Sequence, residues 1–490
     1  QAWFYTTSRL LTKGLLAPTN VGYGWSILLL PFSLAGGPNL VSALPAIVLL
    51  NVLVLMPIAM AAMYGIGERL GGRLFGYWIL LLWIALPLIG IKYTDTGFKQ
   101  RYSELTLPNG FGLTSLSDFP TMVALAVAAF FCLRALQHEA WWPDAALAGA
   151  FAGVAIGIKP SSSLFLGGAV LALVGCRRWR GLVAFGAAIV PFLLALTVWK
   201  WRGLGYVPLF HAERGAHLAA GAMLEPLGAL NLHQYINLNW SQLSSNLGSL
   251  QEHFWSARVV EWTLVAGTVA LARRGLAPFL LFGGWFWAFL LVKGTGNAGD
   301  LETGALLRML MPAIPAFVVM VAALPLLLPR TTRLLPRTDV HPWATQRVTT
   351  TMLAAAVLLF AVVPIALAGG STPTNKGFAM TTSGPIPLDS GLDLHARVAA
   401  GRIELTWSPQ HSDGGPLFYE ILRADHGACS VPPSFSACAK IVGFTRGRNY
   451  VDAPPTGRYD YWVLVGANWI DTPTAGDEYV ASEPVTVTDP

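Results

Sequence analysis

Ten long apolar segments constrain this chain more than any other feature. A helix needs about 20 mostly apolar residues to cross a bilayer. We expect membrane-spanning helices at 38–64, 74–92, 119–136, 144–158, 161–176, 181–199, 257–272, 275–293, 307–328 and 349–369. Of the 490 residues, 54% are hydrophobic and 12% are charged, whereas soluble domains carry roughly 25% charged residues. The sequence therefore predicts a multi-pass α-helical membrane protein.

Two short parts of this pattern leave alternatives open. The break at Lys159-Pro160 either separates two short spans or kinks one longer element. The apolar stretch 23–36 is too short to cross, so we expect it to lie along the interface or to re-enter the membrane.

Arginines cluster between the apolar segments and indicate the orientation. They fall on one common side when the spans alternate, and an excess of Lys and Arg marks the cytoplasmic side. The clusters are Arg69 and Arg73; Arg177, Arg178 and Arg180; Arg273 and Arg274; and Arg330, Arg333, Arg337 and Arg347. We therefore read the net charge of +6 as a topology signal rather than a nucleic-acid signal. Residues 1–37, 93–118, 200–256, 294–306 and everything after about 370 are expected outside the cytoplasm.

The loop from Lys92 to Pro120 carries charges, a Gly-Pro turn and an acid, Asp118, at the mouth of the next span. Ionisable groups at a membrane boundary are costly, so they are functional-site hypotheses by default. The alternative for Asp118 is that it caps the following helix, with Pro120 in the first turn. We predict Asp118 as the catalytic residue, acting as auxiliary base, metal ligand or acceptor-orienting group.

Two cations also occupy predicted outer helix ends. Lys159 ends one span, and Arg308 begins another just after the loop GTGNAGDLETG. Arg suits phosphate because its donors form a fork. The ordinary alternative is that both side chains anchor their helices by reaching to the headgroups. We predict both as substrate-binding residues.

Five further residues of the predicted outer face are weaker candidates for substrate contact: Asp95, Lys99, His211, Glu302 and Tyr5. Their ordinary alternatives are solvation of a loop for the polar residues and a place in the interfacial aromatic belt for Tyr5. No metal-ligand spacing, phosphate loop or Ser/His/Asp pattern stands out, so no metal ligand is predicted. A divalent cation, Mg²⁺ or Mn²⁺, stays open as a cofactor.

The chain changes character near residue 371. Residues 371–386 form a linker rich in Thr, Ser, Gly and Pro. In 387–490, short alternating runs between turn clusters predict an all-β sandwich. The runs ELTWSP, FYEILRAD, GRYDYWVLVGAN and SEPVTVT resemble strands B, C, F and G of a fibronectin type III domain. Trp407 would then be the core tryptophan, and Tyr459 or Tyr461 the tyrosine of strand F.

The four cysteines fall into two kinds. Cys132 and Cys176 lie in apolar segments and are expected to be inert core residues. Cys429 and Cys438 lie in the polar C-terminal part, where they can close a short disulfide if that part is outside the cytoplasm.

Several motifs of residues 1–370 resemble the GT-C superfamily of polyprenyl-phosphate-dependent glycosyltransferases, especially the group that contains protein mannosyltransferases and the lipid A aminoarabinose transferase. Residues 1–37 match a juxtamembrane stretch, Ser117–Pro120 an acid-x-Pro motif, Gly153–Pro160 a helix end with Lys-Pro, and Arg308–Pro315 an arginine motif that begins a span. The principal catalytic acid of that family normally lies just upstream of the position of Gln1. We therefore expect the chain to be a fragment that lacks its first helix and this acid.

The resemblance implies an inverting transfer of a sugar from a polyprenyl-phosphate donor to a glycan, lipid or protein acceptor outside the cytoplasm, in the cell membrane. Nucleic acid is not an expected partner. The rival hypotheses are a transporter or flippase of lipid-linked saccharides, and a non-catalytic membrane scaffold. A flippase predicts inverted repeats with broken helices at matching positions, and the sequence shows no such symmetry.

Overall fold

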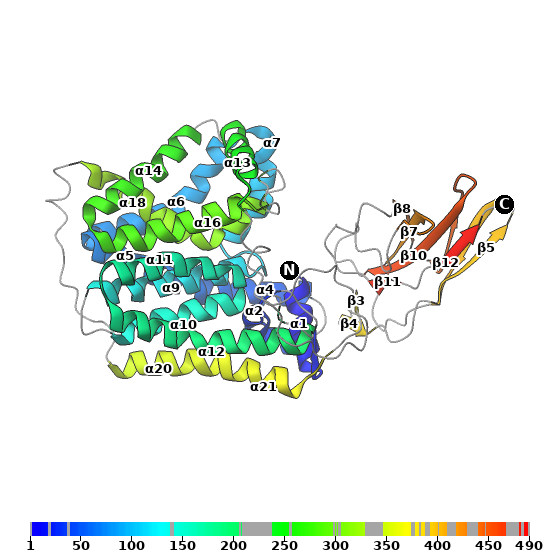
Figure 1. Ribbon diagram of the computed structural model, residues 1–490, viewed down its shortest axis with the longest axis horizontal. Coiled ribbons are helices and arrows are strands. Elements are labelled where there is room, and N and C mark those ends of the chain that lie inside the picture. Colours follow the sequence, from blue (N-terminus) through cyan, green and yellow to red (C-terminus); the bar gives the residue numbers. More distant parts are fainter. Residues whose placement is uncertain are drawn as a thin grey trace.

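The structure is a computed structural model. It describes residues 2–17, 21–36, 40–137, 142–204, 207, 238–253, 257–296, 299, 301, 305–328 and 346–373 and, towards the C-terminus, 378–381, 384–387, 393–399, 401–408, 418–428, 440–445, 447–466, 480–481 and 485–488. The described residues up to 373 are mostly helical, and those from 378 onwards form strands and the connections between them (Figure 1).

Helices occupy most of the described residues up to 370, and short 3₁₀ or π turns, labelled η, interrupt them. The first are α1 (Ala2–Thr12), α2 (Gly24–Leu28), α3 (Leu30–Ala35), α4 (Leu40–Leu50), η1 (Asn51–Leu55), α5 (Met56–Gly71), α6 (Arg73–Tyr93), α7 (Thr96–Arg101), η2 (Tyr102–Thr106), α8 (Leu107–Gly110), α9 (Asp118–Gln137) and α10 (Trp142–Ile158). The next are η3 (Pro160–Leu164), α11 (Phe165–Gly175), α12 (Trp179–Leu204), α13 (Trp240–His253), α14 (Ala257–Arg274), α15 (Leu276–Pro278), η5 (Phe279–Gly283) and α16 (Gly284–Gly294). The last are α17 (Ala305–Leu310), η6 (Met311–Ala313), α18 (Ile314–Ala322), η7 (Leu324–Leu327), α20 (Gln346–Val357), η8 (Leu358–Val362) and α21 (Val363–Gly370).

Seven helical segments of the described residues are long and apolar enough to cross a membrane: Leu40–Gly71, Arg73–Lys92, Asp118–Gln137, Trp179–Leu204, Leu276–Gly294, Ala305–Ala322 and Val348–Gly370. Each overlaps a predicted span, which confirms the membrane character of the helical part. The predicted spans 144–158 and 161–176 are shorter apolar helices. The predicted span 257–272 lies in α14, a helix with three arginines and a glutamate that is not among the seven.

The centre of the bundle is α9, whose residues from Asp118 to Leu136 are all buried. It packs against α5 and α10 (Figure 1). Twenty residues at about 1.5 Å per residue give α9 a length of about 30 Å, the thickness of the hydrocarbon core of a bilayer. Because α10 runs back along α9, the residue after α10, Lys159, returns to the end where α9 begins. Asp118, the first residue of α9, and Lys159 therefore lie at the same end of the bundle.

Strands link the two ends of the helical part. The short β1 (Leu15–Leu16) pairs in parallel with β2 (Thr372–Pro373), which follows α21 directly. Arg202 adds hydrogen bonds to the backbone oxygens of Ala368 and Ser371. The start of the C-terminal part is thus held beside α1, at the end of the bundle where α9 begins (Figure 1).

The C-terminal part consists of antiparallel sheets. A hairpin joins β3 (Phe378–Thr381) and β4 (Gly384–Pro387). One sheet contains β5 (His395–Ala399), β6 (Arg402–Thr406) and β9 (Asn449–Asp452). The other contains β7 (Phe418–Asp425), β8 (Lys440–Thr445), β10 (Arg458–Gly466), β11 (Val480–Ala481) and β12 (Val485–Thr488).

One apolar core joins these two sheets. Leu405 of β6 and Trp407 just after it pack in the same cluster as Ile421 of β7 and Tyr461 of β10. The four sequence runs for which strands were predicted overlap, in chain order, the strands β6, β7, β10 and β12. The prediction of a β-structured C-terminal part is therefore confirmed, and Trp407 lies in its core.

Candidate functional site

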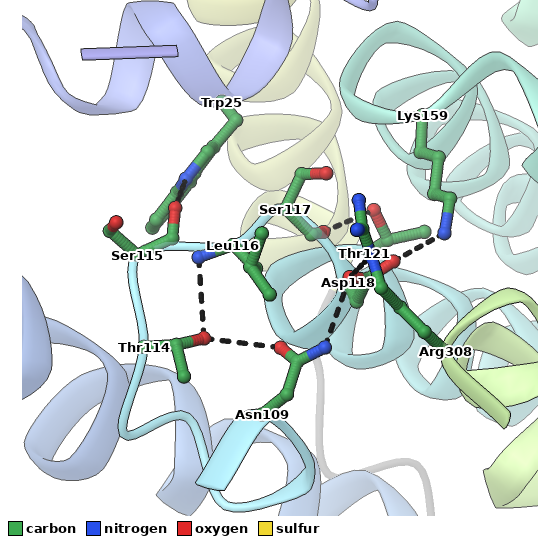
Figure 2. A network of polar contacts seen from close by, with 10 residues as sticks. All are labelled: Trp25, Asn109, Thr114, Ser115, Leu116, Ser117, Asp118, Thr121, Lys159 and Arg308. Carbon is green, nitrogen blue, oxygen red and sulfur yellow. Dashed lines mark hydrogen bonds and ion pairs between the residues drawn. The ribbon is translucent and has the colours of Figure 1, made fainter. Parts of the chain in front are cut away.

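Asp118 is the centre of a polar cluster at one end of the bundle. Its side chain is fully buried, and its carboxylate accepts hydrogen bonds from three side chains that belong to other elements (Figure 2). Lys159 forms an ion pair with Oδ1. The Arg308 Nε lies 3.1 Å from Oδ2, and the Asn109 Nδ2 lies 3.0 Å from the same oxygen. These contacts run across the fold, so helix capping alone does not account for Asp118.

The loop before α9 is folded back to deliver Asn109 to this acid. Thr114 donates to the Asn109 Oδ1 over 3.2 Å, which leaves the amide nitrogen facing Asp118 (Figure 2). The buried Asn51 donates to the backbone oxygens of Gly112 and Thr114. Trp25 of α2 donates its indole N–H to the Ser115 oxygen over 2.7 Å. The bonds from Asn51 and Trp25 satisfy backbone oxygens that the apolar surroundings would otherwise leave without water.

The same loop requires a glycine at residue 112. Gly112 has φ +71°, and a Cβ at this position would lie 2.9 Å from the Asn51 Cβ and 2.9 Å from the Phe119 ring. Both the left-handed backbone and the lack of space exclude larger residues.

Lys159 reaches the acid because α10 stops one residue earlier. Its backbone is extended, with φ −139° and ψ 104°, and Pro160 opens the following 3₁₀ turn. The residue before a proline disfavours the helical region, so the helix must end here. The break at Lys159-Pro160 is therefore a separation of two helices, and it turns the lysine towards α9.

The cluster carries more positive than negative charge. Lys293, half-buried near the end of α16, lies close enough to Lys159 for their charges to repel. Asp118 faces Lys159 and Arg308 directly. Three cations and one carboxylate leave a net charge of +2 among these four groups. The Arg308 side chain is 56% exposed, so the cationic side of the cluster lies at the surface of the bundle.

Asp95 and Lys99 lie in a neighbouring group. Asp95 caps α7 by accepting from the Phe98 N–H, and its second oxygen lies 3.2 Å from the His253 Nδ1. These two hydrogen bonds hold the pKa of Asp95 below its ordinary value. Lys99 is exposed on α7. Asp95 thus bonds to Phe98 and His253, whereas Asp118 bonds to Lys159, Arg308 and Asn109, so the two acids have separate sets of partners.

The other predicted residues divide into two groups. Tyr5 is fully buried in α1, which packs on α2, α3 and β4, and burial raises the pKa of its hydroxyl. Tyr5 therefore belongs to the core beside the cluster. His211, Glu302, Cys429 and Cys438 lie outside the described residues, so the substrate-contact and disulfide predictions for them stay predictions.

Within the described ranges, no group of three or more His, Cys, Asp or Glu side chains is placed to hold a metal ion.

A second polar cluster lies at the other end of α9. The Arg134 Nε lies 3.0 Å from the Asp144 Oδ2, and both side chains are almost fully buried. Arg69 donates to the Gln137 Oε1 over 3.0 Å, and the guanidiniums of Arg69 and Arg134 lie over the Phe130 ring. This cluster joins the ends of α5 and α9 to the start of α10.

Sequence reasoning missed three residues that contribute to the first cluster or its loop: Asn109, which bonds Asp118; Asn51, which holds the loop; and Lys293, which lies near Lys159. The signal for Asn51 was present, because an amide inside a 32-residue apolar helix needs partners. The π turn in which Asn51 lies is a feature often found at functional sites. Asn109 and Lys293 had no comparable local signal.

Comparison of the chain with known protein families, with curated proteins and with solved structures finds no match.

Proposed function

We propose that this chain is a membrane glycosyltransferase that transfers a sugar from a polyprenyl-phosphate donor to an extracytoplasmic acceptor. The observation that carries the proposal is the set of cations around Asp118. Lys159 and Arg308 come from different helix ends and contact Asp118 directly, and Lys293 of α16 lies close enough to Lys159 for their charges to repel.

The charge of the cluster suits a lipid-linked phosphate. A donor of this kind holds its phosphate at headgroup depth, while its isoprenoid chain lies among apolar helices. Transfer breaks the bond between the sugar C1 and the phosphate oxygen and forms a bond from C1 to the acceptor oxygen. The phosphate keeps the electron pair and gains one negative charge, and the acceptor hydroxyl gives its proton to a base. Cations held in advance stabilise this developing charge most where water is sparse.

Asp118 then holds the cations rather than meeting the substrate. Its carboxylate is fully buried and already accepts from Lys159, Arg308 and Asn109. We therefore assign Lys159 and Arg308 to the donor phosphate and give Asp118 the task of orienting them. Because the Arg308 side chain is partly exposed, an incoming phosphate would contact its guanidinium first.

The arginine pattern supports the proposed orientation. Arg69 and Arg134 lie at the end of α9 opposite to Asp118. If that end faces the cytoplasm, the Asp118 cluster and the C-terminal sheets face outwards. The sheets start beside the cluster's end of the bundle because β1 pairs with β2, so we propose that they help to bind the acceptor, a glycan, lipid or protein.

The test is transfer by the full-length protein in lipid nanodiscs, supplied with a panel of radiolabelled polyprenyl-phosphate sugars and envelope acceptors, with and without Mg²⁺. Wild type should transfer one of the sugars. Arg308→Ala and Lys159→Ala should each lower kcat/KM by about 10²-fold or more, because each removes a preorganised charge.

The matched control is Lys92→Ala, which removes an exposed cation from the outer end of α6. It should retain activity within about twofold, the range of an ordinary surface substitution. Failure of wild type to transfer any sugar, or an equal loss in Lys92→Ala and Arg308→Ala, would overturn the proposal.

A further inference from the structure

The polar helix α13 contains one buried amide whose donors and acceptor all bind a single neighbouring segment. The Asn246 side chain is 2% exposed. Its Nδ2 donates to the backbone oxygens of Gly294 and Gly299, over 2.9 and 2.6 Å. Its Oδ1 accepts from the Leu301 N–H over 3.1 Å. An amide offers two N–H donors and one oxygen, so both donors and the oxygen are engaged.

The segment that Asn246 binds connects two cations of the site. Lys293 is the residue just before Gly294, and Arg308 lies in α17, which begins four residues after Leu301. The amide contacts the segment at its start, at Gly299 and at Leu301. It therefore ties together backbone groups on both sides of the turn that separates Lys293 from Arg308.

The helix that carries Asn246 is itself anchored. The backbone oxygen of His253, at the end of α13, accepts from the Asp95 N–H over 2.8 Å. The His253 ring stacks on Phe98 of α7 at 5.0 Å. Phe98 shares a small apolar core with Leu301 and with Leu306 of α17. The helices α7, α13 and α17 thus form one packed unit, and Asn246 supplies hydrogen bonds inside it.

We propose that Asn246 is a positioning residue, which sets the separation of Lys293 and Arg308 so that both reach one phosphate. This inference rests on the proposed function. Replacement by Ala leaves two carbonyl oxygens and one N–H of the segment without their partner. Replacement by Asp keeps an acceptor for Leu301 but turns a carboxylate towards two carbonyl oxygens, which repel it.

The first arm of the test concerns the segment alone. Hydrogen exchange of the full-length protein in nanodiscs should show the Leu301 amide exchanging at least about fivefold faster in Asn246→Ala than in wild type, since losing one buried hydrogen bond costs about 1 kcal/mol or more and about 1.4 kcal/mol corresponds to tenfold. Unchanged exchange would overturn the inference whatever the protein's activity.

The second arm measures binding of a short-chain polyprenyl monophosphate. Asn246→Ala and Asn246→Asp should each raise its Kd by about tenfold or more, the effect of losing roughly 1.4 kcal/mol. With an active donor, the donor KM should rise while the acceptor KM stays unchanged. Equal binding by wild type and both variants would overturn the inference but leave the proposed function intact.

The control is Asn239→Ala, just before the first residue of the same helix. Asn239 accepts from the Ser241 and Gln242 N–H groups in the first turn of α13, so its loss weakens the helix without removing the bonds to the segment. It should bind the phosphate within about twofold of wild type, as expected for a change outside the site. A loss as large as that of Asn246→Ala would show a general effect of weakening α13 and overturn the positioning role. No binding by wild type itself would refute both the proposed function and the inference.

Discussion

The ion pair between Asp118 and Lys159 allows a quantitative test of the cluster by a double-mutant cycle in the full-length protein. The two residues lie 41 positions apart and meet only in the folded bundle. Asp118→Asn removes the negative charge at nearly constant shape. Lys159→Met removes the positive charge and keeps an apolar stem of similar length. Asp118→Asn leaves Lys159 and Arg308 without their carboxylate, and Lys159→Met leaves Asp118 with Arg308 as its remaining cation partner among the described residues, whereas the double change removes both members of the pair.

The magnitude follows from burial. Removing one partner of a buried pair costs about 3–5 kcal/mol. Lys159→Met should lie near the lower end, about 3 kcal/mol, because the fully buried Asp118 keeps Arg308 as a partner and Arg308 is screened by its exposure. Asp118→Asn should cost about 2 kcal/mol, because the lysine that loses its partner is 20% exposed and Arg308 is 56% exposed. Without coupling, the double variant would lose the sum of the two single losses, about 5 kcal/mol. We expect it to lose only about 3 kcal/mol, which gives a coupling energy of about 2 kcal/mol.

The assay is equilibrium unfolding in mixed micelles, followed by tryptophan fluorescence, for wild type and the three variants. The matched control is the Arg73–Glu68 pair, whose nitrogen and oxygen are 3.6 Å apart and whose arginine is 83% exposed. A pair of this kind should show a coupling of about 0–1 kcal/mol. If the Asp118–Lys159 coupling were no larger than that of the surface pair, the cluster would not be the tight, desolvated assembly on which the functional argument depends.

Two further predictions concern the glycine of the site and the sheets. Gly112→Ala should destabilise the protein by about 1–3 kcal/mol in the same unfolding assay, since it strains a left-handed residue. The control Gly110→Ala, whose added Cβ meets nothing within 4 Å, should change stability by less than about 0.5 kcal/mol. Equal effects of the two changes would contradict the steric argument. Burial would raise the pKa of Asp460, but hydrogen bonds from His426, Gly427 and Thr486 outweigh it and lower that pKa. Its stabilisation is therefore full above the unfolded-state pKa, near 3.9, and is lost as the pH falls through the folded pKa. Calorimetry of the full chain between pH 7 and pH 3 should show a larger fall in Tm for wild type than for Asp460→Asn, and equal falls would contradict this role.

Much of the helical part could be predicted because apolar segments report directly on their surroundings. A run such as 119–136 has no charged residue except Arg134, and its hydrophobicity alone predicts a buried or membrane-spanning helix. The span 257–272 shows the limit of this reasoning. It overlaps a helix, but charged residues near both ends of α14 remove it from the set of continuous apolar spans.

The candidate site could be predicted only in part. Asp118, Lys159 and Arg308 stood out because a charge at the end of an apolar segment is costly and therefore conspicuous. That these three residues lie on the same side of the membrane could be predicted only by assuming that successive spans alternate in direction. Asn109 and Lys293 carry no comparable local signal, and only the folded chain brings Asn109 to Asp118 and Lys293 near Lys159.

Local sequence patterns were enough to predict most of the apolar helices and the main strands, because hydrophobic period and turn residues act over a few neighbouring positions. The tertiary structure alone decided that Asp118 lies between Lys159 and Arg308, which are 41 and 190 positions away along the chain. Such a meeting depends on how helices pack side by side and on where each one ends. Local pattern cannot specify that packing, because the same apolar surface suits several neighbours.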